Sequence, residues 1–256
     1  MPWNPEIYNQ YKDIRYKPFY DLLAFIEEKD NFKGIDLGCG TGEQPAIITH
    51  RFKGAHILGV DSSAEMLEKA NEFENSRLHF KLEHIEDVIN SDNTWDLVFS
   101  NAALQWVDDH EKLFPKIIGL LNPGGQLAIQ MPVQNENLLN QILLTLVQEE
   151  PYANHLGYYV RKSPVLSIDD YAQILFQCGM EDLEISQKVY PIIAENTEEL
   201  YEFISGSALI PYVERLDPEL KKSFIKEFKK RIQEIFTKFP AIYAFKRLLI
   251  YGKLAR

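Results

Sequence analysis

Short apolar runs alternate with amphipathic stretches in a regular order between residues 32 and 132. Apolar runs bounded by turn residues are typical of buried strands, and apolar positions three and four residues apart are typical of helices. Their regular alternation predicts βαβ units and a largely parallel sheet. We expect strands at 33–37, 55–60, 77–82, 95–100 and 125–131, with helices between them at 43–52, 63–73 and 110–121.

The flanks of this region carry further helical patterns. Residues 7–29 predict one or two helices ahead of the first strand, and residues 135–149 predict another. Ser167 and Asp170 have the spacing of a capping box, which marks a helix start. The Asn122-Pro123-Gly124-Gly125 segment is a stop and turn signal, so the strand after it is expected to begin at Gly125.

A long helical segment separates the last two expected strands. These strands are predicted at 182–190 and 246–255, and residues 195–239 between them are helical by their pattern. A connection of this length is most simply a cap over a substrate cleft. The expected division is an N-terminal helical segment 1–31, a core 32–192, a cap 193–245 and a final core strand 246–256.

Charge and composition exclude several classes of protein. The chain has 256 residues and a net charge of −11, so it lacks the surplus of Lys and Arg that general nucleic-acid binding requires. It has no apolar stretch long enough for a membrane span and no secretory signal pattern. Its two cysteines, Cys39 and Cys178, form neither a disulfide framework nor a metal-type pair. We therefore expect a cytoplasmic protein without metal, membrane anchor or nucleic-acid partner.

The strongest chemical signal is a glycine turn after the first expected strand. Asp36 precedes Gly38, Gly40 and Gly42, and Glu43 follows them. Glycines at such a turn let the backbone bend sharply and approach a ligand closely. The spacing is G-x-G-x-G, whereas a dinucleotide site would have a glycine at position 43.

Two aspartates indicate which ligand this turn binds. Asp36 would repel a pyrophosphate, but it suits S-adenosylmethionine, which carries a sulfonium and an α-ammonium group. Asp61 ends the second expected strand, where an acidic residue accepts hydrogen bonds from ribose hydroxyls in Rossmann sites. Taken separately, the glycines could form only a tight turn, and Asp61 with Ser62 only a helix cap. Taken together, they favour an S-adenosylmethionine site.

Further segments carry a resemblance that runs nearly from end to end. They are Trp3-Asn4-Pro5 with Tyr8 and Arg15, Asn101 to Trp106, Leu113-Phe114-Pro115, Leu121-Asn122-Pro123 and Gln130-Met131-Pro132. In these segments and the glycine motif, the chain resembles the trans-aconitate methyltransferase family of class I methyltransferases. The resemblance implies an α/β fold with a Rossmann-like seven-stranded class I methyltransferase sheet, a helical N-terminal segment and a helical cap. It also implies that S-adenosylmethionine methylates a carboxylate of a small tricarboxylic acid.

The chain departs from this family at two points. Where the family usually has an Asp that contacts the adenine amino group, this chain has His84, followed by Ile85. A neutral histidine accepts a hydrogen bond through one ring nitrogen, so this contact is still implied; a surface histidine without a role is the alternative. In the cap, Ile210-Pro211 replaces the family's Arg-Pro pair, which puts trans-aconitate itself in question as the substrate.

These arguments assign two groups of site residues. The cofactor group is Asp36, Gly38, Cys39, Gly40, Gly42, Asp61, Ser62, His84, Ile85 and Asn101. The substrate group is Tyr8, Arg15, Gln105, Trp106 and Arg161. The Arg15 guanidinium suits a carboxylate, either of the acceptor or of the donor's methionine part. Solvated-surface or core roles are the alternatives for these residues.

No catalytic base is expected. A carboxylate has a pKa of about 4, so the nucleophile is already ionised at neutral pH. The chain needs only to hold it in line with the donor methyl group. Two other functions stay open: an O-methyltransferase for a malonyl group on a carrier protein, and a non-catalytic protein that binds S-adenosylmethionine. A monomer is expected, although the sequence does not decide between monomer and dimer.

Overall fold

The computed structural model describes residues 12–256, with the backbone alone for residues 12–15. The described chain divides into two units. The sheet unit contains residues 18–132, 164–188 and 247–256, and the helical unit contains residues 133–163 and 189–246 together with residues 12–17. Each unit is built from segments that are distant in the sequence, because the chain passes between the two units several times.

The sheet unit is built on seven strands in the order β3-β2-β1-β4-β5-β7-β6. The first five strands are parallel along β3-β2-β1-β4-β5, and β7 pairs antiparallel with β5. The strands are β1 (Lys33–Leu37), β2 (His56–Asp61), β3 (Leu78–Leu82), β4 (Trp95–Asn101), β5 (Leu121–Pro132), β6 (Met180–Ala194) and β7 (Ala241–Leu254). The predicted fold class is confirmed.

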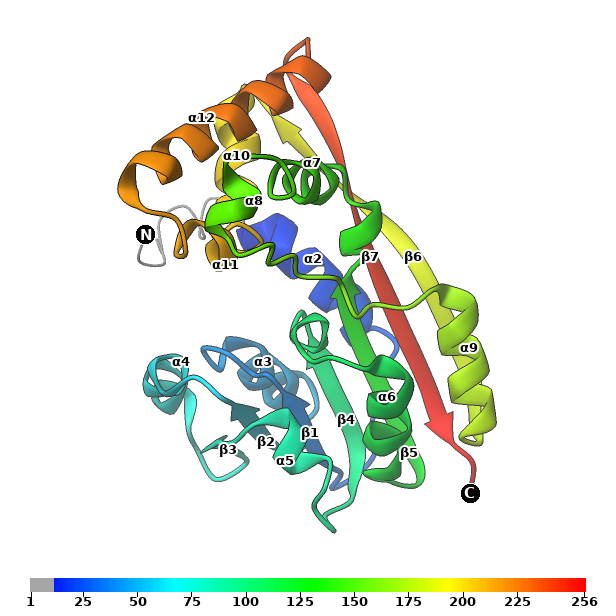
Figure 1. Ribbon diagram of the computed structural model, residues 1–256. Helices are drawn as coiled ribbons and strands as arrows, with labels where there is room; N and C mark the ends of the chain where they lie inside the picture. The colour runs from blue at the N-terminus through cyan, green and yellow to red at the C-terminus, as the bar shows by residue number, and fades with distance from the viewer. Residues whose placement is uncertain (1–11) are drawn as a thin grey trace. The chain divides into compact units, whose positions relative to one another are not determined.

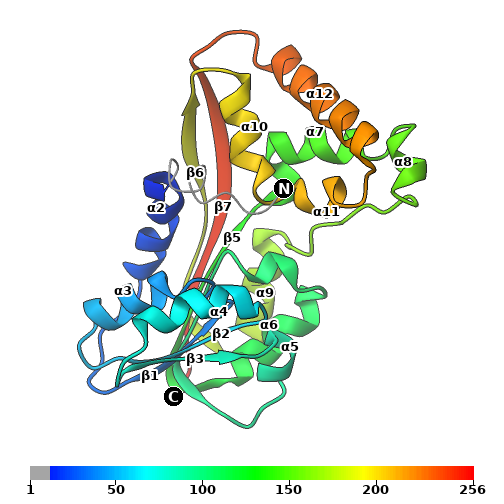
Figure 2. The same ribbon diagram turned by 90° about the vertical axis from the view of Figure 1, so that its left-hand side faces the viewer.

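Helices cover both faces of this sheet (Figures 1 and 2). On one face, α3 contacts β2 and α4 contacts β3, and on the other α6 packs on β5 and against α9. Phe19 of α2 joins the first face, with its ring centroid 5.8 Å from that of Phe99 in β4. The helices are α2 (Lys12–Leu23), α3 (Glu43–Arg51), α4 (Ala64–Ala70), α5 (Ile85–Val88), α6 (His110–Gly119) and α9 (Ile168–Gln177).

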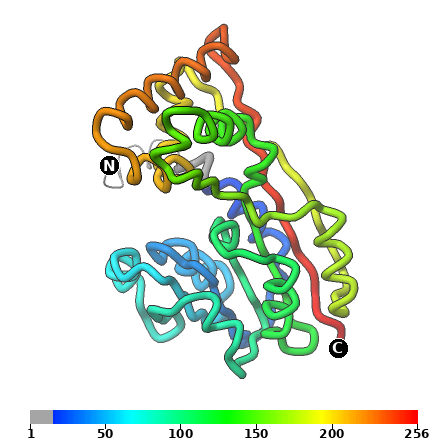
Figure 3. Tube along the Cα trace, in the orientation of Figure 1, coloured from blue at the N-terminus to red at the C-terminus, as the bar shows by residue number. Residues whose placement is uncertain are grey.

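The helical unit has its own apolar core. One face of the long helix α12 (Pro218–Ile235) supplies Phe224, Phe228 and Ile232, which are fully buried in this cluster. Its other helices are α7 (Leu138–Leu146), α8 (Tyr152–His155), α10 (Thr197–Ser205) and α11 (Ile210–Val213). The prediction that 195–239 is mainly helical is confirmed. β6 and β7 run on from the sheet unit into this unit, as the continuous trace of Figure 3 shows.

Two local signals have different outcomes. The capping box is confirmed, because Ser167 Oγ accepts the Asp170 backbone N–H at 3.1 Å and Asp170 Oδ2 accepts the Ser167 N–H at 3.3 Å. The predicted start of the fifth strand at Gly125 is wrong, because β5 begins at Leu121. Leu121 pairs with Trp95 but Gln126 pairs with Leu97, so the turn-forming residues between them bulge out of the ladder.

Among residues 12–256, no helix combines the length and the apolar character needed to cross a membrane. The same residues contain no cluster of three or more His, Cys, Asp or Glu side chains arranged to hold a metal ion.

Candidate functional site

The glycine turn links β1 to α3 at the carboxyl end of the sheet. Gly38, Gly40 and Gly42 all have positive φ, at 79°, 56° and 78°. A Cβ on Gly38 would lie 2.2 Å from Ala103 Cβ, so the loop after β4 packs directly on this glycine. A Cβ on Gly40 would meet no described atom within 4 Å. Gly38 is therefore required by packing and backbone conformation, whereas Gly40 is the glycine beside open space.

Asp61 ties this turn to the next helix. Its Oδ2 accepts the Gly40 N–H at 2.9 Å, and its Oδ1 accepts the Ser63 N–H at 2.9 Å. The cap of α4 is Ser63, whose Oγ accepts the Met66 N–H at 3.3 Å, while Ser62 is exposed. Each carboxylate oxygen keeps lone pairs for a further donor. The carboxylate is thus held in place by backbone amides and retains capacity for ribose hydroxyls.

Asp36 is a buried carboxyl without a protein partner. The residue is 1% exposed, and neither side-chain oxygen has a hydrogen-bond partner among residues 12–256. Burial, and secondarily the charge of Asp61, raise the pKa of Asp36 to about 8. An unpaired buried carboxyl is costly unless a ligand supplies the missing donor or positive charge. A cationic ligand such as S-adenosylmethionine fits this requirement.

Asn101 lies at the end of β4, on the same face of the sheet as Asp36. Asp36 pairs with Phe99, and Asn101 is two residues further along β4, so the side chains point the same way. Asn101 Nδ2 donates to Gln44 Oε1 at 3.0 Å, which connects β4 to the first turn of α3. Its Oδ1 is buried and has no partner among the described residues. Asp36 and Asn101 therefore present unsatisfied acceptors at one edge of the sheet.

A buried histidine contacts the loop after β4. Gln105 is buried and donates from Nε2 to Ala102 O at 2.6 Å, whereas Trp106 is exposed. His110 Nε2 lies 3.0 Å from Leu104 O, and its Nδ1 lies 2.5 Å from the Tyr171 hydroxyl. Burial lowers the pKa of His110. A neutral ring donating from Nε2 and accepting at Nδ1 satisfies both contacts, which is a structural role.

The other cofactor candidates lie around the turn in different settings. Cys39 packs with Leu67 and Ala70, and its thiol pKa is raised by burial first and then by the charges of Asp36 and Asp61. His84 is exposed at the position before α5 and caps no backbone amide with its side chain. The roles of Cys39, Ser62, His84 and Ile85 toward a ligand stay predictions.

Three substrate candidates are outside the described side chains or the sheet unit. Tyr8 and the side chain of Arg15 lie outside the described residues. Arg161 belongs to the helical unit, where its backbone N–H donates to the Tyr212 hydroxyl at 3.1 Å. Their binding roles stay predictions.

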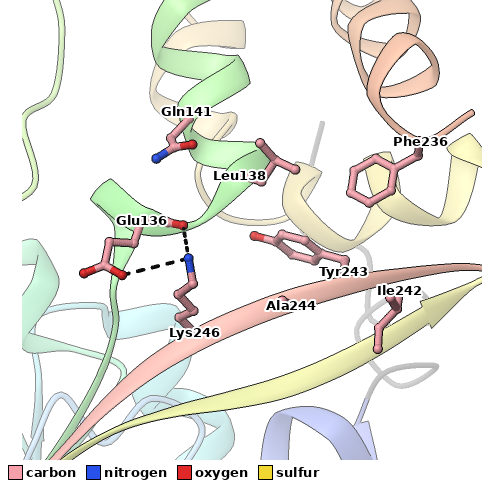
Figure 4. Close-up of a pocket in the computed structure, with 8 residues that line it drawn as sticks. All are labelled: Glu136, Leu138, Gln141, Phe236, Ile242, Tyr243, Ala244 and Lys246. Atoms are coloured by element: carbon pink, nitrogen blue, oxygen red, sulfur yellow. Dashed lines mark hydrogen bonds and ion pairs between the residues drawn. The ribbon is translucent and has the colours of Figure 1, made fainter.

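The helical unit contains a pocket of about 400 Å³ between α7 and the start of β7 (Figure 4). Lys246 is the basic residue of its lining, and its Nζ donates to Glu136 O at 2.8 Å and lies 3.9 Å from Glu136 Oε2. The remaining wall is largely apolar, with Leu138, Phe236 and Ile242 among its residues. The Glu136 carboxylate of this pocket lies near the Lys246 ammonium, whereas the Asp36 carboxyl has no described partner. The pocket is therefore less suited to a cationic ligand than the region around Asp36.

Sequence reasoning missed a buried polar pair on the sheet. Gln130 of β5 is completely buried, Arg247 of β7 is 9% exposed, and Arg247 NH1 donates to Gln130 Oε1 at 2.6 Å. The available signal was Gln130 between two apolar residues in β5, and Arg247 at the start of an apolar run in β7. Such positions are more informative than surface charges, because buried polar groups require a specific partner.

Comparison with known proteins gives a consistent result. A family profile described as a methyltransferase domain matches residues 28–197. The trans-aconitate 2-methyltransferase of Deinococcus radiodurans is 39% identical over 97% of this chain and 97% of its own length. The corresponding protein of Variovorax paradoxus is 32% identical over 99% of this chain and 96% of its own length.

Solved structures agree on the fold. The YcgJ protein of Bacillus subtilis superposes with a TM-score of 0.64 at 16% identity, over 94% of this chain and 99% of its own. A Haemonchus contortus phosphoethanolamine N-methyltransferase, solved with S-adenosylhomocysteine, gives a TM-score of 0.60 at 18% identity, over 96% of this chain and 56% of its own.

Proposed function

The chain belongs to the trans-aconitate 2-methyltransferase family of S-adenosylmethionine-dependent methyltransferases, and on that premise we propose that it esterifies a carboxylate of a small acidic metabolite. The predicted family, enzyme class and cofactor are confirmed by this membership. The acceptor is proposed to be a free di- or tricarboxylic acid similar to trans-aconitate. The expectations of a monomer, a cytoplasmic location and no nucleic-acid partner stay predictions.

The observation that carries this proposal is the set of unsatisfied acceptors at the carboxyl edge of the sheet. Asp36 and Asn101 present buried oxygens without partners among the described residues, and Asp61 is fixed beside them by Gly40. These oxygens complement an α-ammonium group, a sulfonium charge and ribose hydroxyls. They would be poorly suited to a ligand whose contacting groups are all anionic.

Methyl transfer to a carboxylate requires the protein mainly to position the reacting groups. S-adenosylmethionine supplies an electrophilic methyl group when it is bound. A carboxylate acceptor is ionised at neutral pH, so no side chain has to remove a proton from it. Holding the reacting atoms in line at about 3–3.5 Å is the main contribution that a site of this kind makes. This agrees with a buried His110 that is engaged on both ring nitrogens and serves the loop instead of the substrate.

The test is transfer of a tritiated methyl group from S-adenosylmethionine to a panel of small di- and tricarboxylic acids, with a malonyl-carrier protein alongside. We expect a base-labile methyl ester on a free acid. Label on the carrier alone would replace the proposal with the carrier-protein activity. Donor binding with no label on any acceptor would indicate a non-catalytic protein.

The donor site is tested separately by thermal denaturation with S-adenosylhomocysteine. A ligand that binds only the folded state raises Tm. Asp61→Ala should remove most of this rise, because it removes the carboxylate assigned to ribose and also releases the Gly40 amide. Asp92→Ala is the matched control, since Asp92 is an exposed aspartate of the same unit. An equal Tm rise in Asp61→Ala and wild type would contradict the ribose assignment.

A further inference from the structure

Two buried glutamines lie on the same face of β5. Gln126 and Gln130 are both completely buried, and each contacts a polar side chain of the antiparallel neighbour β7. Gln126 meets Tyr251, and Gln130 meets Arg247. The two strands run side by side along the sheet (Figure 1). The same side chain on the same strand thus occurs in two settings that can be compared directly.

Gln126 uses both ends of its amide inside the protein. Its Oε1 accepts the Glu27 backbone N–H at 2.7 Å and the Tyr251 hydroxyl at 2.9 Å. Its Nε2 donates to Glu27 O at 2.9 Å. This amide connects β5, β7 and the segment after α2, and a purely structural role accounts for it.

Among residues 12–256, Gln130 has a hydrogen-bond partner at only one end of its amide. A guanidinium has donors and no acceptor, so the 2.6 Å contact from Arg247 NH1 requires the amide oxygen of Gln130 to face Arg247. The amide Nε2 therefore points away from Arg247. This Nε2 is buried and has no hydrogen-bond partner among residues 12–256. A buried amide donor without a partner is costly, and a bound ligand is one explanation for keeping it.

The position of Gln130 favours a ligand. Gln130 pairs in register with Asn101, so the two side chains lie next to each other at the carboxyl edge, where open α/β sheets bind ligands. Unsatisfied acceptors belong to β1 and β4, on Asp36 and Asn101. Donors belong to β5 and β7, on Gln130 Nε2 and the Arg247 guanidinium. The β1 and β4 part of this edge is therefore suited to a cation, and the β5 and β7 part is suited to an anion.

We propose that Gln130 Nε2 and the Arg247 guanidinium together bind a carboxylate of the methyl acceptor. This assignment deepens the function proposed above and rests on it. A carboxylate has two oxygens that accept hydrogen bonds in one plane, which matches an amide N–H beside a guanidinium. Gln130 also accepts a hydrogen bond from Arg247 through its oxygen. It would therefore both contact the bound carboxylate and orient the Arg247 guanidinium. The carboxylate of S-adenosylmethionine itself has the same chemistry. The experiment below distinguishes it from a carboxylate of the methyl acceptor.

The decisive variant is Gln130→Glu. The new carboxylate still accepts from Arg247 but replaces the Nε2 donor with a negatively charged oxygen that repels an acidic ligand. The measurements are the Kd of S-adenosylhomocysteine, the Kd of trans-aconitate and related tricarboxylates in its presence, both by calorimetry, and kcat/KM for methylation. We expect acid affinity and kcat/KM to fall at least about tenfold, as loss of a charge-assisted hydrogen bond does. The Kd of S-adenosylhomocysteine should stay within about twofold.

The matched pair Gln130→Leu and Gln126→Leu separates binding from folding. Gln126→Leu should lower Tm and leave the acid Kd unchanged, because Gln126 has no role at the edge. Gln130→Leu should weaken acid binding even where its Tm equals that of Gln126→Leu. Equal acid affinity in Gln130→Glu, Gln130→Leu and wild type would overturn the proposal.

Three further outcomes are distinct. A Gln130→Glu protein that loses affinity for S-adenosylhomocysteine but not for the acids would assign this carboxylate subsite to the donor and overturn the acceptor assignment. Wild-type protein that binds acids through Gln130 without methylating them would overturn the proposed function and support the subsite. Wild-type protein that neither binds nor methylates any acid would overturn both.

Discussion

Two asparagines show how differently the two units use a side-chain amide. Asn137 of the helical unit is completely buried, and its amide accepts the Lys246 N–H at 2.8 Å and donates to Lys246 O at 3.1 Å. Asn101 of the sheet unit donates to Gln44 at 3.0 Å, and its buried Oδ1 has no described partner. The first amide is satisfied at both ends by the Lys246 backbone, whereas the second leaves an acceptor available among the described residues.

The comparison extends to the surroundings of each residue. The helical unit packs aromatic and aliphatic side chains of α7, α10 and α12 into one cluster. At the carboxyl edge of the sheet unit, Asp36, Asn101 and Gln130 each keep at least one buried polar atom without a described partner. Because such atoms weaken a fold that has no ligand, their concentration at one edge supports the proposed site.

The largest expected effect is that of Gly38→Ala. The substitution combines positive φ, which costs about 1–2 kcal/mol for a side-chain-bearing residue, with a contact at 2.2 Å to Ala103 Cβ that requires repacking at about 1–3 kcal/mol. Chemical denaturation should show both costs, and the Tm rise with S-adenosylhomocysteine should disappear. Gly157→Ala in the helical unit is the control, because its φ is 60° with no described atom near the new Cβ. A Gly38→Ala protein no less stable than Gly157→Ala would contradict the packing argument.

The next expected effect separates stability from cofactor binding in variants of the two asparagines. Asn137→Leu leaves the Lys246 N–H without its acceptor, which costs about 1–3 kcal/mol, and should leave the Kd of the cofactor unchanged. Asn101→Leu should cost less stability, because its amide makes one hydrogen bond to the described residues, but should weaken cofactor binding by about tenfold. Denaturant titration and calorimetry measure the two quantities. The distinction between the units fails if both variants change the same quantity.

A third expected effect is a pH dependence from Asp36. Its pKa is about 8 in the folded, ligand-free protein and about 4 in the unfolded chain, so folding keeps a proton on this group. Its contribution to stability is fully present below about pH 4 and is lost as pH rises through about 8. Asp36→Asn removes this dependence, so its Tm relative to wild type should rise between pH 5 and pH 8.5. Asn137→Leu retains Asp36 and should follow the wild-type slope; parallel curves for Asp36→Asn would contradict the assignment.

Local sequence signals predicted the features whose partners are close in the chain. The strand, glycine turn and helix from β1 to α3 follow from glycine spacing and apolar pattern, and the capping box at Ser167 and Asp170 needs only residues within one turn. The helical character of 195–239 likewise follows from periodicity. The start of β5 was wrong because Leu121 pairs with Trp95, a partner that a local turn signal does not contain.

The sequence by itself determined the cofactor class and the βαβ order, because the glycine spacing, Asp36 and Asp61 act through residues that flank consecutive strands. Only the tertiary structure decided which polar residues meet at the sheet edge. Gln130 and Arg247 are 117 residues apart, and the antiparallel pairing of β5 with β7 brings them together. Whether a buried amide is satisfied depends on such distant partners, and for that reason Gln126 and Gln130 look alike in the sequence while their hydrogen bonds differ in the fold.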